Sequence, residues 1–246
     1  MINILVPMAG KSQYFSEHEF PFPKPLIEIG AKTVIEHVIA NLSSIATKAR
    51  FIFVVNSGDC RKFHLDSTLN LITDHQCKIV RLEHETMGAA CSALMAVSHI
   101  ANDAPLIIAN SDQIFTSPLQ ALAHNFEGAD AGVITFDSVH PRWSYVRLDE
   151  NQHVVETAEK RPISRNAIAG LYYFKHGREF VDSAMSMIQK DSSVNGIFYI
   201  SPTLNEMILK GKVITTARVN TDAYHTFYTP QKIKEYEAQL LRHQSP

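Results

Sequence analysis

Apolar runs alternate with longer mixed segments along the first half of the chain. Short strands are predicted at 2–6, 51–55, 79–82 and 105–109. The run at 51–55 is continuously apolar, which is typical of a strand buried on both faces. The segments between these strands are predicted to be helices, at 33–45, 60–72 and 89–100. This strand–helix order predicts an α/β fold with a Rossmann-like, mostly parallel sheet flanked by helices.

The first predicted helix begins with a specific signal. Thr33 is followed three residues later by Glu36, and this spacing predicts a capping box in which each residue satisfies a free backbone N–H group. The apolar residues that follow recur at helical spacing, at Ile35, Val38, Ile39, Leu42 and Ile45. The pattern predicts an amphipathic helix.

The second half of the chain has more strands and fewer helices. Antiparallel strands that extend the sheet are predicted at 131–136, 145–148, 154–156 and 167–174. The other predicted elements are a strand at 213–219 and helices at 178–189, 202–210 and 231–241. The chain has no repeat, low-complexity tract or Gly/Ser linker, so we expect residues 1–246 to form a single domain with two lobes.

Composition and charge bear on the partners and the compartment. The net charge is −2, from 23 basic and 25 acidic residues, which gives no electrostatic case for nucleic acid or an anionic membrane as the main partner. No apolar run approaches the ~20 residues of a membrane span, and the first residues lack the basic region of a signal peptide. The cysteines at 60, 77 and 91 show no C-x-x-C spacing and fit reduced thiols. We therefore expect a cytoplasmic protein.

The first thirty residues carry the most informative chemistry. The opening strand runs into Pro7-Met8-Ala9-Gly10, and a glycine turn at a strand end brings bare backbone N–H groups close to a ligand. Lys24 follows between Pro23 and Pro25, whose rings restrict the backbone on both sides of it. A flexible cation is thus presented at a fixed place near a site suited to phosphate, which indicates a nucleotide-handling enzyme.

Two more polar segments follow predicted strands. Ligands of open α/β sheets bind beyond the carboxyl ends of the strands, where we expect both the turn at 85–90, which contains Gly88, and Asp112. A carboxylate at a strand end beside a phosphate site is a natural Mg²⁺ ligand. The simpler alternatives are that Gly88 only permits a tight turn and that Asp112 caps a helix starting at Ser117-Pro118.

Sequence motifs extend in order through nearly the whole chain. They are Pro-Met-Ala-Gly at 7–10, Phe-Pro-Lys-Pro-Leu at 22–26, Glu-Thr-Met-Gly-Ala-Ala at 85–90, Ala-Asn-Ser-Asp-Gln at 109–113, Glu-Lys at 159–160, Pro-Ile-Ser at 162–164, Ala-Gly-Leu-Tyr-Tyr-Phe at 169–174, Phe-Tyr-Ile-Ser-Pro at 198–202 with Asn205, and Thr-Pro at 229–230. In this order they resemble the nucleotidylyltransferases that make activated sugars and related compounds, that is, the nucleoside-diphosphate-sugar pyrophosphorylases. The most similar subgroup is the short bacterial type found with capsule and surface-polysaccharide genes, which includes cytidylyltransferases acting on small phosphorylated acceptors.

The resemblance implies a reaction. A nucleoside triphosphate, with CTP or dTTP favoured, and a phosphorylated sugar or other small phosphorylated acceptor give a nucleoside-diphospho compound and pyrophosphate. Mg²⁺ is the implied cofactor and neutralises the charge that develops as the acceptor phosphate attacks the α-phosphorus. Such chemistry depends mostly on positioning and electrostatics. Residues 1–115 would form the nucleotide-binding half and residues 116–246 the acceptor-binding half. Homo-oligomerisation stays open.

The resemblance also assigns nucleotide-binding residues. Met8, Ala9 and Gly10 would line the nucleotide through backbone groups, and Thr86 and Gly88 would border the base or the ribose.

Other assignments concern the reacting groups and the acceptor. Lys24 would contact the phosphates near the reacting centre, and Asp112 would hold Mg²⁺. Glu159 and Lys160 would face the acceptor, with Lys160 near its phosphate, and Gly170 would let the acceptor approach the backbone closely.

The first loop departs from the family pattern. The family loop usually continues as Gly-x-Gly-x-Arg, whereas this chain has Gly10-Lys11-Ser12-Gln13-Tyr14. Ser12 takes the place of a glycine, and Tyr14 that of an arginine that stabilises the departing pyrophosphate. Loss of one such donor costs about 10²–10³ in rate, and a neutral tyrosine cannot supply the charge. We hypothesise that Lys11 partly replaces the missing cation, which makes it a catalytic candidate beside Lys24 and Asp112.

The second metal-binding acid of the family is also altered. Many relatives carry an aspartate just before the terminal Thr-Pro, but residues 224–228 contain no acid, and Asp222 is the nearest one. Asp222 is therefore the candidate for a second metal ligand.

Two alternatives to an active nucleotidylyltransferase stay open. Ser12 and Tyr14 are compatible with a catalytically impaired, nucleotide-binding relative. A nucleotide-sugar glycosyltransferase is the other alternative, although residues 110–112 supply only half of the Asp-x-Asp metal motif of that class. A Rossmann dehydrogenase is not favoured, because no G-x-G-x-x-G follows the first strand.

Overall fold

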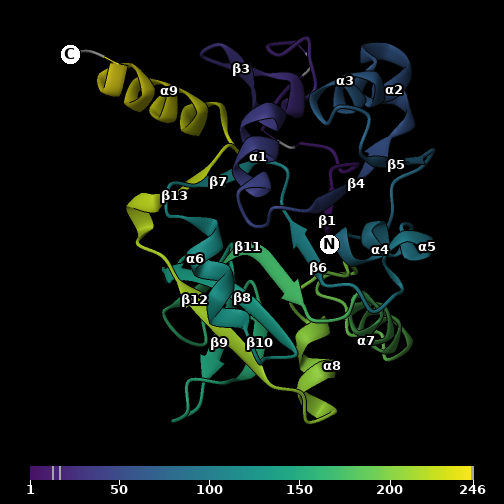
Figure 1. Ribbon diagram of the computed structural model, residues 1–246, viewed down its shortest axis with the longest axis vertical. Coiled ribbons are helices and arrows are strands. Elements are labelled where there is room, and N and C mark those ends of the chain that lie inside the picture. The colour runs from purple at the N-terminus through teal and green to yellow at the C-terminus, as the bar shows by residue number, and fades with distance from the viewer. Residues whose placement is uncertain (13, 17, 245–246) are drawn as a thin grey trace.

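The computed structural model describes residues 1–12, 14–16 and 18–244. Within these residues, nine strands form one central sheet (Figure 1). They are β1 (Ile2–Pro7), β4 (Ala49–Asn56), β5 (Lys78–Leu82), β6 (Leu106–Ala109), β8 (Ala131–Asp137), β9 (Ser144–Leu148), β10 (Val154–Glu159), β11 (Asn166–Phe174) and β12 (Ile214–Arg218). The main path through the sheet is β10-β9-β11-β6-β1-β4-β5, and β8 joins β11 to β12.

The first half of the chain contributes the parallel part of the sheet. β1 lies between β4 and β6 and is parallel to both, and β4 is parallel to β5. β11 then pairs antiparallel with β6, so the strands of the second half continue the same sheet. The predicted fold class, a Rossmann-like and mostly parallel mixed sheet, is confirmed.

Helices cover both faces of this sheet and enclose two apolar cores. One core includes residues of α1 (Val34–Ser43), α2 (Ser57–Phe63), α3 (Leu65–Ile72), α6 (Leu119–Ala123) and α9 (Pro230–Gln244). The other includes residues of α4 (Ala89–Leu94), α5 (Val97–Ile100), α7 (Gly177–Gln189) and α8 (Thr203–Leu209). Successive strand residues point to opposite faces. Ile4 and Val6 of β1 therefore enter the first core, and Leu5 enters the second.

Two segments that were predicted to be helical are each divided into two helices, so the prediction of one helix over 89–100 was wrong. The segment at 60–72 forms α2 and α3, which are separated by His64 in the left-handed conformation, with φ of 54°. The segment at 89–100 forms α4 and α5. Between them, Met95 and Ala96 donate backbone hydrogen bonds to carbonyls three residues earlier, which tightens the chain.

Several short elements had no clear sequence signal. A hairpin of β2 (Glu28–Ile29) and β3 (Lys32–Thr33) precedes α1, and the 3₁₀ helices are η1 (Lys24–Leu26), η2 (His124–Phe126) and η3 (Thr221–Ala223). β7 (Gln113–Phe115) pairs antiparallel with β13 (Tyr224–Thr226). This last pair brings the C-terminal part of the chain beside the end of β6, where Asp112 lies.

The start of α1 agrees with its sequence signal. The Thr33 hydroxyl accepts a hydrogen bond from the backbone N–H of Glu36, and the Glu36 carboxylate accepts one from the backbone N–H of Thr33 at 2.7 Å. The predicted capping box is confirmed.

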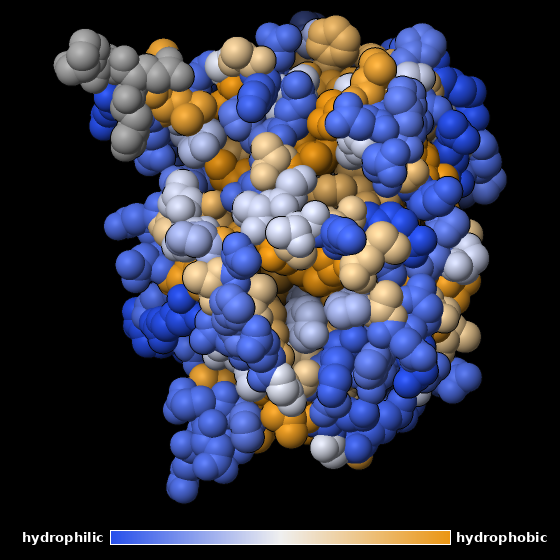
Figure 2. All heavy atoms as spheres, viewed as in Figure 1, coloured by the Kyte–Doolittle hydropathy of each residue, from blue (hydrophilic) through white to orange (hydrophobic). Residues whose placement is uncertain are grey.

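No helix in the described part of the chain is long and apolar enough to cross a bilayer. Figure 2 shows hydrophilic side chains over most of one face, with apolar side chains visible in a hollow across its middle.

Candidate active site

Two cavities border the loop after β1, and this loop forms a wall of the larger one. β1 ends at Pro7, and the backbone N–H of Met8 donates to the Val54 carbonyl at 2.8 Å, which holds the start of the loop against β4. Met8 and Ala9 are buried and line a cavity of about 790 Å³. The polar residues that line the same cavity are Lys11, Ser12, Lys24, Asn56, Asp59, Lys62, Asn110, Ser111 and Asp112.

Lys24 and Asp112 form an ion pair in this cavity. Lys24 begins η1, and Asp112 follows β6 by three residues. The Lys24 Nζ lies 2.6 Å from Asp112 Oδ2, and the two side chains are only 17% and 16% exposed. Such a short, charge-assisted contact fixes both groups. The alternative in which Asp112 caps the next helix is wrong, because Pro118 is the N-cap of α6.

Neighbouring contacts hold Asp112 from two directions. Its backbone carbonyl accepts a hydrogen bond from the N–H of Phe227 at 2.7 Å. The next residue, Gln113, is buried, and its side chain donates to the Gly170 carbonyl at 2.8 Å and accepts from the Tyr224 hydroxyl at 3.0 Å. The backbone of Asp112 and the side chain of Gln113 are therefore held by segments from the second half of the chain.

Gly170 lies directly against these residues. Its φ is +61°, and an added Cβ would be 2.3 Å from Asn110 Nδ2 and 2.4 Å from Gln113 Oε1. The absence of a side chain thus makes room for two side chains of the Asp112 segment. The expected approach of an acceptor to Gly170 stays a prediction.

A smaller cavity of about 210 Å³ borders the same loop after β1. Thr86 and Gly88 line it, and the larger cavity shares four of its other residues, Pro7, Ala9, Gly10 and Lys11. Gly88 has a φ of +120°, and a Cβ there would lie 2.4 Å from the Phe198 carbonyl oxygen. A backbone hydrogen bond joins the Gly88 turn to the Phe198 segment, since the N–H of Phe198 donates to the Met87 carbonyl at 2.7 Å.

The altered part of the first loop borders the larger cavity at Lys11 and Ser12. The Lys11 ammonium is 3.0 Å from the Glu85 carboxylate, and the Lys11 side chain is 85% exposed. Tyr14 packs edge-on against Tyr228, with 5.7 Å between the ring centroids. Gln13 lies outside the described residues.

Glu159 and Lys160 lie at the end of β10. One carboxylate oxygen of Glu159, Oε2, accepts hydrogen bonds from the Ser144 and Ser201 hydroxyls, the second at 2.8 Å. Burial raises the pKa of Glu159, although these two hydroxyls partly oppose the shift. Lys160 is exposed, has a φ of 54° and holds its ammonium 4.9 Å from the ring centre of Tyr199. Neither residue lines the two cavities above.

The donor set around Asp112 fits a magnesium ion only together with substrate oxygens. No group of three or more His, Cys, Asp or Glu side chains with metal-binding geometry occurs in the part of the chain that the structure describes. Mg²⁺ is usually held by one or two carboxylates, waters and substrate phosphates, so a single carboxylate is compatible with it. Asp222 lies in η3, before β13. Since Tyr224 pairs with Phe115 and Phe227 contacts Asp112, the register places Asp222 beyond the opposite end of β13.

The sequence prediction missed one wall of the larger cavity. Asn56, Asp59, Lys62 and Phe63 line it, and they lie at the end of β4 and in α2. The carboxyl end of β4 meets the same sheet edge as the ends of β1 and β6, so the strand-end rule could have included this segment.

Comparisons with known proteins agree with this architecture. Residues 4–180 match the model of the MobA-like NTP transferase domain. The crystal structure of a nucleoside-diphosphate-sugar pyrophosphorylase from Vibrio cholerae RC9 has a TM-score of 0.83 and 22% identity, over 96% of this chain and 100% of that one. The inositol-1-phosphate CTP transferase from T. maritima has a TM-score of 0.75 and 15% identity, over 99% and 96% of the two chains. The chain belongs to the family of MobA-like NTP transferase domains and is a nucleotidyltransferase of that type.

Proposed function

We propose that this protein transfers a nucleoside monophosphate from a nucleoside triphosphate, CTP or dTTP, to a phosphorylated sugar or other small phosphorylated acceptor. Pyrophosphate is the second product, and the reaction serves surface-polysaccharide precursor synthesis in the cytoplasm. The observation that carries the proposal is the ion pair of Lys24 and Asp112 in a cavity at the ends of β1 and β6. A cation and a carboxylate beside a loop of backbone N–H groups suit a triphosphate with a bound divalent ion.

The two cavities suggest how the nucleotide would lie. The base and ribose would occupy the smaller cavity beside Thr86 and Gly88. The triphosphate would cross the backbone of Met8, Ala9 and Gly10 into the larger cavity. Both cavities are lined by Pro7, Ala9, Gly10 and Lys11, which supports the binding of one extended ligand across them.

Lys24 and Asp112 would exchange partners when the substrates bind. In the free protein each side chain neutralises the other at 2.6 Å. In the complex the Lys24 ammonium would contact the phosphates, and the Asp112 carboxylate would hold Mg²⁺ with the phosphate oxygens. When bound, Mg²⁺ neutralises the negative charge that develops on the transferring and leaving groups. Asp222 as a second ligand would require a change in the position of η3.

The acceptor phosphate would attack the α-phosphorus in line, and the bond to the bridging oxygen of pyrophosphate would break. Glu159, Lys160 and Gly170 are the proposed acceptor residues. Glu159 supports this role because its carboxylate is partly buried without an ion pair among the described residues, which suits hydrogen bonds from acceptor hydroxyls. Lys11, which borders both cavities, is the proposed partial substitute for the missing loop arginine.

The names of the structural relatives support the class of substrate. One is described as a nucleoside-diphosphate-sugar pyrophosphorylase, and the other as an inositol-1-phosphate CTP transferase. A phosphorylated polyol acceptor and a pyrimidine nucleotide are consistent with both names.

The first experiment is a thermal-shift panel of nucleoside triphosphates with Mg²⁺. A ligand that binds only the folded protein raises the melting temperature by mass action, so one triphosphate should raise it more than the others. Pyrophosphate release is then measured across acceptor phosphates. If the protein is instead a glycosyltransferase, no triphosphate yields pyrophosphate, and nucleoside diphosphate is released when a nucleotide sugar is supplied as the donor. Binding without pyrophosphate release from any acceptor supports the impaired relative.

Three variants test the assigned residues in the same assay. Asp112→Asn should abolish Mg²⁺-dependent pyrophosphate release. Asp222→Asn tests the second candidate metal ligand, and a rate of pyrophosphate release equal to that of the parent would remove Asp222 from the metal site. An unchanged rate of Lys11→Ala would likewise remove the hypothesis that Lys11 replaces the missing arginine.

A further inference from the structure

Arg142 is a cation to which the proposed reaction has so far assigned no role. It lies in the loop between β8 and β9, and its guanidinium carbon is 4.2 Å from the ring centre of Trp143 and 4.1 Å from that of Tyr228. Cation–π contacts of this kind favour the charged form and fix the guanidinium plane. Arg142 is thus held between two aromatic rings.

Arg142 has no carboxylate partner among the residues that the structure describes. In residues 1–12, 14–16 and 18–244, no carboxylate lies within ion-pair distance of its guanidinium, and its Nε is buried without a hydrogen-bond partner. Burial lowers the pKa of Arg142, but an arginine still carries its charge at neutral pH. A partly desolvated cation with unused donors favours an anionic ligand.

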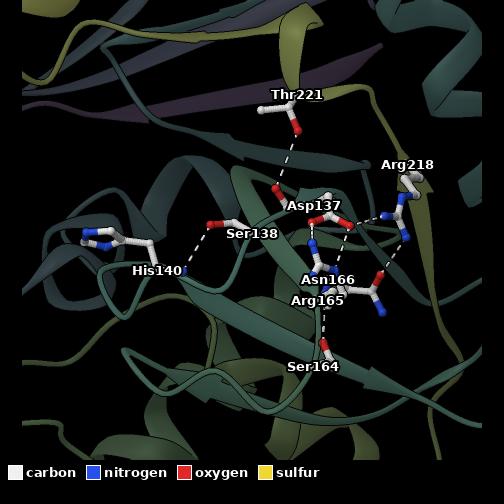
Figure 3. Close-up of polar contacts among 8 residues, drawn as sticks. All are labelled: Asp137, Ser138, His140, Ser164, Arg165, Asn166, Arg218 and Thr221. Atoms are coloured by element: carbon white, nitrogen blue, oxygen red, sulfur yellow. Dashed lines mark hydrogen bonds and ion pairs between the residues drawn. The ribbon is translucent and has the colours of Figure 1, made fainter.

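The loop that carries Arg142 begins at an anchored strand end. Asp137 accepts hydrogen bonds from Arg165 and from Arg218, and Arg218 also donates to the Asn166 side chain (Figure 3). The Arg218–Asp137 contact measures 3.0 Å. These bonds join β8, β11 and β12 where the loop leaves the sheet.

His140 holds the middle of the same loop. Its backbone N–H donates to the Ser138 hydroxyl at 3.2 Å, as Figure 3 shows, and its Nδ1 accepts from the backbone N–H of Arg142 at 3.3 Å. Its carbonyl accepts from the Tyr145 hydroxyl at 2.6 Å. The backbone of Arg142 is therefore positioned before any ligand binds, which lowers the entropic cost of binding.

Arg142 lies next to both the nucleotide loop and the Asp112 segment. Tyr228, on which its guanidinium stacks, directly follows Phe227, whose N–H donates to the Asp112 carbonyl. Tyr14, from the nucleotide loop, packs edge-on against the same Tyr228 ring. Arg142 itself comes from the acceptor half of the chain.

We propose that Arg142 binds the phosphate of the acceptor. The inference rests on the proposed function, in which two anions must meet, the triphosphate and the acceptor phosphate. Lys24 and Lys11 lie on the cavity walls where the triphosphate is proposed to bind. An arginine on the acceptor side, without an ion-pair partner among the described residues, supplies the opposing charge for the second anion, and its planar group can contact two phosphate oxygens at once.

The chain carries its own reporter for this site. Trp143 is the only tryptophan, and its ring contacts the Arg142 guanidinium. Inorganic phosphate is titrated into the full-length protein, with KCl added to keep the ionic strength constant, while Trp143 fluorescence is recorded. We expect a saturable change for the parent protein and its loss in Arg142→Gln.

Two more variants sharpen the titration. Arg142→Lys keeps the charge but loses the paired donors, so we expect phosphate to bind about tenfold more weakly, as for the loss of one charged hydrogen bond. Arg147→Gln is the matched control, because Arg147 is exposed and already paired with Glu156 at 2.7 Å. It should titrate like the parent. If Arg142→Gln does not fold, Arg142→Lys still decides the question.

Several outcomes would overturn the proposal. A phosphate response that persists in Arg142→Gln, or that is unchanged in Arg142→Lys, excludes Arg142 as the anion ligand. In turnover assays, a raised KM for the triphosphate with an unchanged KM for the acceptor would assign Arg142 to the pyrophosphate side instead. If no triphosphate binds at all while the response still depends on Arg142, the proposed function fails and the anion site itself stands.

Discussion

At the residue scale, Lys24 and Asp112 are 88 positions apart in the chain and are nevertheless bonded at 2.6 Å. Both side chains are mostly buried, so removal of one partner leaves the other as an uncompensated charge. The proposed catalytic role of this pair is therefore coupled to stability. A variant of either residue has to be tested for folding as well as for turnover.

Lys24→Met is expected to lower the rate of pyrophosphate release by about 10²–10³, the typical effect of removing one preorganised donor to the transition state. The variant should also be less stable than the parent, because Asp112 loses its ion-pair partner. The measurement is the initial rate with the triphosphate identified in the thermal-shift panel. Lys210→Met, at an exposed lysine outside both cavities, is the control. A Lys24→Met rate equal to that of the control would contradict the role of Lys24.

At the element scale, the cavities depend on how short turns meet elements from elsewhere in the chain. The turn before α4 packs against Phe198, and the strand β7 that follows Asp112 pairs with β13. Neither turn nor strand is long enough to be stable alone. Their geometry is maintained by the partners that the fold supplies.

Gly88→Ala should destabilise the protein by about 1–3 kcal/mol from backbone strain alone, because its φ of +120° is unfavourable for a side chain. The 2.4 Å approach to the Phe198 carbonyl oxygen adds to this cost. Urea unfolding measures the difference. Gly10→Ala is the matched control, since nothing lies within 4 Å of its added Cβ, and it should unfold like the parent. Equal midpoints for the two variants would show that the Gly88 turn adjusts freely.

Thr33→Ala should lower the free energy of unfolding by about 0.5–2 kcal/mol, the usual cost of removing an N-cap side chain. The hydroxyl of Thr33 accepts from the N–H of Glu36, and this donor would lose its partner. Ser44→Ala removes a hydroxyl at the other end of α1, where the side chain is exposed. That control should change stability by no more than about 0.5 kcal/mol.

At the scale of the whole molecule, strands from both halves of the chain form one sheet. β11 joins the parallel strands to the antiparallel ones, and its Gly170 accommodates side chains from the segment after β6. Charge pairs on the surface add a second set of links between distant segments. Asp137 pairs with Arg165 and Arg218, and Asp66 pairs with Arg81.

These pairs predict that the protein loses stability in acid. The Arg165 hydrogen bond holds the pKa of Asp137 below its usual range, and Arg81 does the same for Asp66. A carboxyl with a lowered folded-state pKa stabilises the fold fully above its unfolded pKa of ~4 and loses this contribution as the pH falls through the folded value. We expect the melting temperature to decrease steadily below about pH 4, and less steeply in Asp137→Asn. A parallel decrease in both proteins would contradict the prediction.

Glu159 has the opposite effect on the pH dependence of stability. Burial raises its pKa, so its contribution favours the fold at low pH and is lost as the pH rises through the folded-state value. This effect partly offsets the acid loss from Asp66 and Asp137.

The local patterns of the sequence were enough to predict the framework. The apolar runs at 2–6, 51–55 and 105–109 became β1, β4 and β6, and the Thr33 capping box starts α1 as its spacing indicates. These features depend on residues within a few positions of one another, where backbone propensity and side-chain alternation act directly. The strand–helix order then limits the possible topologies to a few.

Features that join distant residues could not be predicted from such patterns. Tyr224 bonds to Gln113 across 111 positions, and the sequence contains no local signal for that contact. His64 interrupts a predicted helix with a left-handed residue, and Arg142 is held by Tyr228 from the end of the chain.

The sequence by itself thus determined the order of the elements, the glycine turns at the strand ends and the residues available for phosphate chemistry. The tertiary structure alone decided which of them meet: Lys24 with Asp112, the Gly88 turn with Phe198, and Arg142 with two aromatic rings. The physical reason is range, because propensity and periodicity act over a few residues. Pairing of charges and exclusion of water act between groups that only the complete fold brings together.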